Sequence, residues 1–114
     1  MHPSKVLVLH KLRQLFAEES SANRAATLLE TYGIEAHEPE RERVQLAILK
    51  LSAGDLSQLE YFVKVAMLDY RDVLAWAEYP EQFRAGASGS DTSPELLRAI
   101  RKRDRQQYEQ WLSE

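Results

Sequence analysis

The sequence predicts an all-α protein: a compact bundle of about five helices, with a C-terminal helix after a Gly/Ser linker. No strand could place on one face the apolar set that recurs at helical spacing over about five turns. That set comprises Leu59, Phe62, Val63, Ala66, Tyr70, Val73, Leu74 and Ala77. The other long apolar stretches also have helical spacing, and four Gly and four Pro are too few for a many-turned β-fold.

Length and composition favour one soluble domain. A chain of 114 residues can bury roughly two-thirds of the surface that it exposes when unfolded. It contains no cysteine, which excludes a disulfide scaffold, a thiolate zinc site and thiol catalysis. The 15 Lys and Arg against 18 Asp and Glu give a net charge of −3. That balance argues against a protein whose whole surface binds nucleic acid.

Two helices are expected before Ile34. The first covers about residues 4–18 and places Leu9, Leu12 and Phe16 on one face. Ser20 or Ser21 can cap the second helix, and Gly33 can end it in the left-handed conformation. The apolar stripe of this second helix is Ala25, Leu28, Leu29 and Tyr32. As an alternative, residues 18–23 could continue one long helix.

The third helix, near residues 44–53, is apolar around most of its circumference. Val44, Ala47, Ile48 and Leu51 form one face, and Leu46 and Leu49 lie on another. A helix with this pattern is usually central in a bundle. Pro39 is expected in its first turn, where the missing N–H is tolerated, and Gly54 is expected to end it.

The long apolar run predicts one helix over about residues 56–79, with Asp55 before it as the N-cap. A helix of that length would span roughly 36 Å. The alternative is a break at Asp69, which could cap a new helix. We favour one helix, bent near Asp69, and expect Pro80 to mark its end.

The C-terminal part divides into a linker and a helix. Residues 1–84 are expected to form the bundle core, and residues 85–93 form a flexible linker by composition. Ser93 as the cap and Pro94 at the first helical position begin a helix over 94–114. Its apolar residues lie toward its two ends, whereas residues 101–107 are polar on every face. This helix therefore packs on the core or on a partner.

The residues give little support for catalysis. His2, His10 and His37 are far apart and lack metal-ligand spacing, so we expect no metal site and no cofactor. Asp69 and Asp72 would share a helix face and could do acid–base work if burial raised one pKa. No nucleophile or cofactor motif accompanies them. We therefore expect no catalytic residues, and a small enzyme using these two acids and His10 is the weakest hypothesis.

The C-terminal helix carries a cluster of positive charge. Five cations fall within eight residues: Arg98, Arg101, Lys102, Arg103 and Arg105. They are candidate phosphate contacts, which salt would weaken. A solvated basic face is the simpler interpretation, because four acids in 94–114 leave the segment with a charge of only 5 − 4 = +1.

A set of aromatic residues favours protein binding. Aromatic side chains at partly exposed positions are enriched in interface cores. The candidate interface residues are Trp76, Tyr79, Phe83, Tyr108 and Trp111. The leading hypothesis is a non-enzymatic helical module that binds another protein or a second copy of itself. The alternative is a regulator that binds nucleic acid through the basic helix. In a third interpretation, these aromatic residues only join the last helix to the bundle.

No targeting signal is expected. The start of the chain has only four consecutive apolar residues, Val6 to Leu9, before His10 and Lys11. A secretory signal needs about 7–15 apolar residues and a membrane span about 20. These observations predict a cytoplasmic protein with no membrane contact.

Two segments, Gly54-Asp55-Leu56 with Leu59 and Asp69-Tyr70-Arg71-Asp72-Val73-Leu74, together with Trp111, resemble small uncharacterised all-α proteins of bacteria. The likeness covers about half the chain, residues 44–80, and consists of a packing pattern with caps. It implies a helical fold and a bacterial, cytoplasmic origin. It implies no activity.

Overall fold

The computed structural model describes residues 3–87 and 93–114, and within these ranges it contains six α-helices and no strand. The helices are α1 (Lys5–Leu15), α2 (Glu19–Glu30), α3 (Arg41–Ser52), α4 (Leu56–Glu78), α5 (Pro80–Ala87) and α6 (Pro94–Ser113). The all-α prediction is confirmed, with one helix more than expected. The additional helix is α5.

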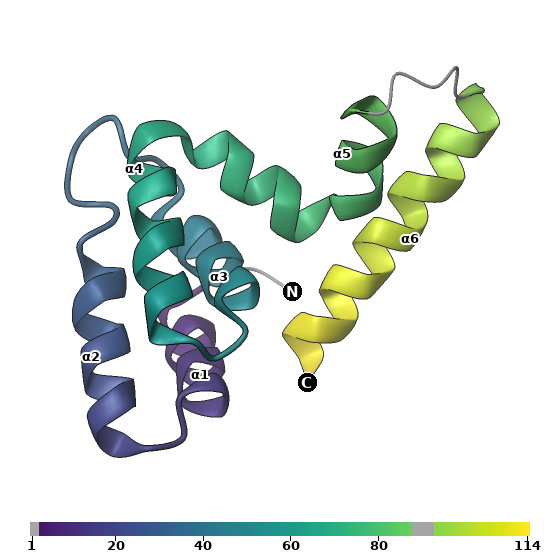
Figure 1. Ribbon diagram of the computed structural model, residues 1–114. Coiled ribbons are helices and arrows are strands. Elements are labelled where there is room, and N and C mark those ends of the chain that lie inside the picture. Colours follow the sequence, from purple (N-terminus) through teal and green to yellow (C-terminus); the bar gives the residue numbers. More distant parts are fainter. Residues whose placement is uncertain (1–2, 88–92) are drawn as a thin grey trace.

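The six helices form two wings. The first wing contains α1, α2, α3 and the first half of α4, and the second wing contains the second half of α4, α5 and α6. The first half of α4 packs with α1, α2 and α3 in one bundle, and its second half leads to α5 (Figure 1). Helix α6 packs against α5 and runs back toward α1, so that the C-terminal end of the chain returns to the first wing (Figure 1).

Helix α3 is the centre of the core, as its apolar circumference predicts. Every residue from Val44 to Leu49 is buried, including the polar Gln45, and α3 packs on both α1 and α4. The Gln45 amide nitrogen donates to the Leu29 carbonyl at 3.1 Å. The buried amide is therefore hydrogen-bonded, as buried polar groups must be.

The boundaries at the two ends of α2 differ in part from expectation. The chain leaves helical geometry between α1 and α2, so residues 18–23 do not continue one long helix. Glu18 occupies the N-cap position without a side-chain cap bond, whereas Ser20 and Ser21 lie inside α2. The capping prediction for the two serines was wrong. Gly33 does end this segment in the left-handed region, with φ of +97°.

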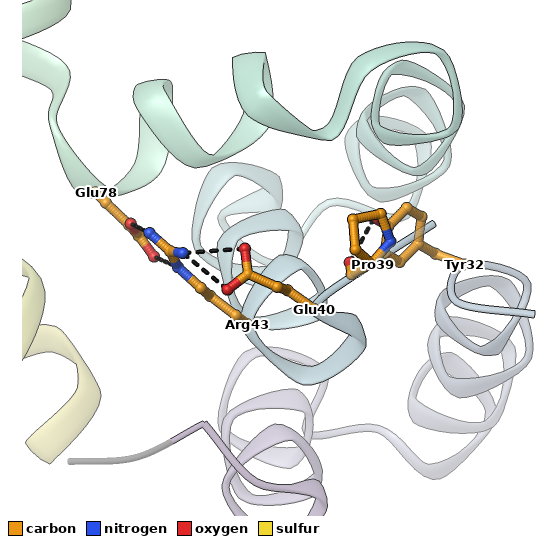
Figure 2. A network of polar contacts seen from close by, with 5 residues as sticks. All are labelled: Tyr32, Pro39, Glu40, Arg43 and Glu78. Atoms are coloured by element: carbon orange, nitrogen blue, oxygen red, sulfur yellow. Dashed lines mark hydrogen bonds and ion pairs between the residues drawn. The ribbon is translucent and has the colours of Figure 1, made fainter. Parts of the chain in front are cut away.

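The connection before α3 corrects the placement of Pro39. Glu40 has φ of 52° and α3 begins only at Arg41, so Pro39 precedes the helix and does not join its first turn. The Pro39 carbonyl instead accepts a hydrogen bond of 2.9 Å from the Tyr32 hydroxyl (Figure 2). Burial is the main reason that the pKa of Tyr32 rises to about 12.

Asp69 breaks α4, and this break gives the molecule its second wing. Its φ of −155° and ψ of 100° are extended, and its Oδ1 accepts the Arg71 backbone N–H at 3.0 Å. Asp69 therefore caps the second half of α4 as Asp55 caps the first, where Oδ1 accepts from Ser57 N and Gln58 N. The favoured prediction, one helix bent near Asp69, placed the irregularity at the right residue, but the chain leaves helical geometry there, and the alternative with a break at Asp69 is the one found.

Pro80 begins a helix as well as ending one. Helix α4 ends at Glu78, as predicted, but α5 starts at Pro80 and continues through Ala87. Residues 85–87 are thus helical and do not belong to the predicted linker of 85–93. Residues 88–92 of that linker lie outside the described residues. Ser93 caps α6 as expected, with its Oγ accepting the Leu96 N–H at 3.2 Å.

Candidate functional site

Helix α6 packs on its own chain through one face. Ile100, Asp104, Tyr108 and Leu112 recur every four residues and are all buried. Tyr108 and Leu112 belong to the main apolar core. The sequence left open whether this helix packs in cis, and the structure shows that it does.

The buried carboxylate of Asp104 joins α6 to α5. Its two oxygens accept the backbone N–H groups of Glu81 at 3.1 Å and Gln82 at 3.0 Å. These N–H groups belong to the first turn of α5, where donors have no partner within the helix. Residues 101–107 are polar on every face, as the sequence shows, but Asp104 is only 1% exposed, so one of these polar residues packs on the rest of the chain. The sequence signal that could have indicated this burial is that Asp104 is an acid within the basic run of residues 101–105.

Two lysines of the bundle attach the C-terminal half of α6. Lys50 donates to the Ala77 carbonyl at 2.6 Å and to the Gln107 side chain at 2.7 Å. Lys11 donates to the Trp111 carbonyl, and its Nζ lies 4.6 Å from the centre of the Trp111 ring. Burial lowers the pKa of both lysines. The resulting contacts tie α6 to α1, α3 and α4.

The two aromatic residues of α6 belong to this internal contact. Tyr108 is 9% exposed and stacks on half-buried Trp111, with ring centres 5.7 Å apart. The sequence predicted both residues as candidates for contact with a partner. Tyr108 is instead covered by residues of its own chain. For these two residues, the interpretation as a contact within the chain is the one that the packing supports.

Replacing Tyr108 with phenylalanine is expected to raise the free energy of unfolding by about 1 kcal/mol. The Tyr108 hydroxyl is buried without a hydrogen-bond partner among the described residues. A buried, unsatisfied hydroxyl is costly, and removing it leaves the ring packing intact. Urea unfolding of both proteins measures the difference. A phenylalanine variant less stable than the wild type would show that the hydroxyl has a partner, such as an ordered water.

An open groove lies between the second half of α4, α5 and α6. It encloses about 890 Å³ and is lined by Ala75, Tyr79, Gln82, Phe83, Arg101, Lys102 and Arg105. Two aromatic residues predicted as interface residues thus meet three cations predicted as phosphate contacts. The two sets lie at least 18 residues apart in the chain, and the packing of α6 against α5 brings them together.

The basic residues of α6 divide into two groups. At about 100° per residue, Arg98, Arg101, Lys102 and Arg105 fall within one arc of the helix and form an exposed basic face. This face borders the buried one, because Arg101 lies seven residues before Tyr108. None of these four has an ion pair among the residues that the structure describes. Arg103 lies on another side of the helix and contacts Glu81 at 3.5 Å. Arg98 belongs to the basic face but does not line the groove.

The aromatic wall of the groove is held by a row of rings. Trp76 is half-buried and contacts Phe62 and Phe83 edge to face, with ring centres 6.2 and 6.1 Å apart. Phe83 remains 44% exposed, and Tyr79 is half-buried. The ring of Trp76 therefore supports Phe83 from behind while Tyr79 and Phe83 line the groove.

A smaller hollow of about 240 Å³ shares Tyr79 and Arg105 with the groove. Its lining includes the acids Glu78 and Glu109. Glu78 is buried and holds the Arg43 guanidinium through two hydrogen bonds of 2.7 and 2.9 Å (Figure 2). Glu109 follows Arg105 by one turn on the same exposed face of α6. Arg43 also lines this hollow and neutralises Glu78, so Glu109 is the acid that lies next to the cations of the groove without an ion pair among the described residues.

The residues proposed for acid–base chemistry are not brought together. Asp69 lies outside helical geometry, so it does not share a helix face with Asp72 as predicted. Hydrogen bonds from Arg71 hold the pKa of Asp69 below its usual range, opposite to what a general acid requires. His10 is exposed and contacts Gln14 on its own helix. No group of three or more His, Asp or Glu side chains that could hold a metal occurs within residues 3–87 and 93–114.

Comparisons with protein-family models, with curated proteins and with solved structures find no match. The resemblance to small bacterial helical proteins therefore stays a prediction. No helix in the described part of the chain is long and apolar enough to cross a membrane.

Proposed function

We propose that this protein is a non-enzymatic binding module, and that its groove between α4, α5 and α6 holds a protein partner. The observation that carries the proposal is the lining of the groove. Partly exposed Tyr79 and Phe83 form an apolar contact surface beside Arg101, Lys102 and Arg105, which have no ion pair among the described residues. Aromatic residues and arginine are the types most enriched in the energetic centres of protein interfaces.

The rest of the structure supports this placement. The buried face of α6 packs on the core of its own chain, whereas the three cations that line the groove stay exposed. Asp104 and Lys50 fix α6 against α5 and α4, which sets the position of the groove wall before any partner arrives. A preorganised site spends less binding energy on ordering its own side chains.

Nucleic acid is the alternative partner, and the charges favour it less. The basic face contains four cations and is followed by Glu109, while the whole chain carries −3. A nucleic-acid backbone continues its negative charge in both directions and binds best along an extended basic track. The groove offers only a short one.

Reversing two charges of the groove is expected to lower partner recovery about tenfold or more. The test uses the full chain with a tag, a native lysate and the variant Arg101→Glu/Arg105→Glu. Losing an arginine anchor at an interface centre costs on the order of 2 kcal/mol, which exceeds a tenfold change. The control is Arg13→Glu/Arg24→Glu, which makes the same charge change at exposed positions of α1 and α2.

Quantitative mass spectrometry and a nuclease arm give the outcomes. A partner that survives nuclease, is lost by the groove variant and is kept by the control supports the proposal. A partner that is lost on nuclease treatment would indicate that the groove binds nucleic acid. Equal recovery by the two variants would show that the groove is not the binding site. Sedimentation of the purified proteins tests in the same way whether the partner is a second copy of the chain.

A further inference from the structure

We infer that the groove binds a short, extended acidic segment of a partner protein, in which Asp or Glu alternates with large apolar residues. This inference rests on the proposed function and names the chemistry of the partner. It comes from three properties of the groove: the sign of its charge, the different chemistry of its two walls, and the spacing of its cations.

Charge complementarity selects an acidic ligand. The lining contains Arg101, Lys102 and Arg105 and no carboxylate among the described residues. The protein as a whole is acidic, so these cations form a local positive site on a chain of net charge −3. Opposite charges at an interface raise the association rate and select the partner.

The two walls of the groove differ in chemistry. Helix α6 supplies the three cations, whereas the end of α4 and α5 supply Ala75, Tyr79 and Phe83. In Figure 1 the second half of α4 leads into α5, and α6 runs beside α5. An extended segment presents successive side chains to opposite sides. Alternation of acidic and apolar residues would therefore direct the acids to α6 and the apolar groups to the rings.

The spacing of the cations fits the same conformation. Arg101 and Arg105 are one helical turn apart, which separates their attachment points by about 6 Å along α6. Alternate residues of an extended chain are about 6.6 Å apart. Two acids at positions i and i+2 of such a segment can therefore each meet one arginine. Glu109 lies one turn beyond Arg105 and limits how far the acidic part can extend in that direction.

The test titrates defined peptides into the isotopically labelled full chain and follows backbone amide signals by NMR. The probe is a capped peptide, Glu-Leu-Glu-Phe-Glu-Leu-Glu. Two matched peptides keep its length: one replaces every glutamate with lysine, and one keeps the composition but groups the four acids before the three apolar residues. Oligothymidine of similar length and inorganic phosphate complete the set.

We expect saturable shifts from the alternating peptide at Ala75, Gln82 and Phe83, with none at α2. The lysine peptide should give no saturable shifts, and the grouped peptide should bind about tenfold more weakly. In Arg101→Glu/Arg105→Glu the Kd of the alternating peptide should rise about tenfold or more, whereas in Arg13→Glu/Arg24→Glu it should change less than about twofold.

Four results would overturn the inference. Equal affinity for the alternating and grouped peptides would show that the groove does not bind an extended segment with acids on one side and apolar residues on the other. Saturable shifts from oligothymidine alone would assign the groove to nucleic acid, and equal effects of phosphate and peptide would reduce it to an anion site. No shifts from any probe would refute an acidic occupant. If the groove variant still loses a nuclease-resistant partner from the lysate in that case, the proposed function stands and only the partner chemistry fails.

Discussion

Replacing Arg43 with methionine is expected to lower the free energy of unfolding by about 2–3 kcal/mol. The guanidinium holds both oxygens of Glu78, at 2.7 and 2.9 Å, and also contacts Glu40 (Figure 2). Glu78 is only 7% exposed, so the methionine variant leaves a buried carboxylate without its cation. Breaking a fully buried pair costs about 3–5 kcal/mol. We expect less because the Arg43 side chain is 35% exposed and water can reach its place.

The double variant Arg43→Met/Glu78→Leu separates the two contributions to that loss. Replacing a buried ion pair by apolar residues of similar size is often neutral or stabilising. Most of the lost stability should therefore return in the double variant, as measured by urea unfolding. Glu40→Gln is the control for the exposed half of the network, and we expect it to cost less than about 1 kcal/mol. A double variant as unstable as Arg43→Met alone would contradict this account of the pair.

Replacing Asp104 with alanine is expected to release the first turn of α5 and to cost about 2–3 kcal/mol. The buried carboxylate accepts two backbone N–H groups of that turn, and hydrogen bonds to charged groups are the strongest of their kind. Alanine leaves both donors in a partly buried place without an acceptor. Hydrogen exchange at the amides of Glu81 and Gln82 should accelerate, and urea unfolding should show the loss of stability.

Two variants calibrate the Asp104 result. Asp104→Asn keeps one acceptor oxygen and should lose about half as much stability as alanine. Arg103→Ala removes a neighbouring exposed side chain and should have an effect within about 0.5 kcal/mol. Because α5 forms one wall of the groove, Asp104→Ala should also weaken binding of the alternating acidic peptide. Unchanged exchange at Glu81 and Gln82 would show that the carboxylate does not hold α5.

Local signals in the sequence were sufficient for most of the helices. The periodic run from Leu59 to Ala77 identified the longest helix and the face that it buries. The apolar circumference of residues 44–49 identified the central helix, and Asp55, Gly33 and Ser93 identified three boundaries. Each of these signals acts over one or two turns, because caps and helix periodicity involve only neighbouring residues.

The misplaced boundaries involve competition between such signals. Asp69 could cap a new helix or remain inside the long one, and its apolar neighbours are compatible with either. Pro80 ends one helix and begins the next. Because Pro80 was interpreted only as a helix end, α5 was not predicted. Both positions decide the direction in which the second wing leaves the bundle, and this direction depends on contacts that no short window contains.

The sequence by itself therefore determined the helical class, the buried face of α4, the buried centre of α3 and the two chemically distinct sets of side chains. Only the tertiary structure decided that members of both sets line one groove. Tyr79 and Phe83 meet Arg101, Lys102 and Arg105 because Asp69 redirects α4 and Asp104 joins α6 to α5. The Asp104 contacts bridge more than twenty residues of sequence, |i−j| of 22 and 23, and a long-range pairing of this kind leaves no periodic trace in the chain. A buried acid and an exposed acid look the same until the fold places one of them against a helix N-terminus.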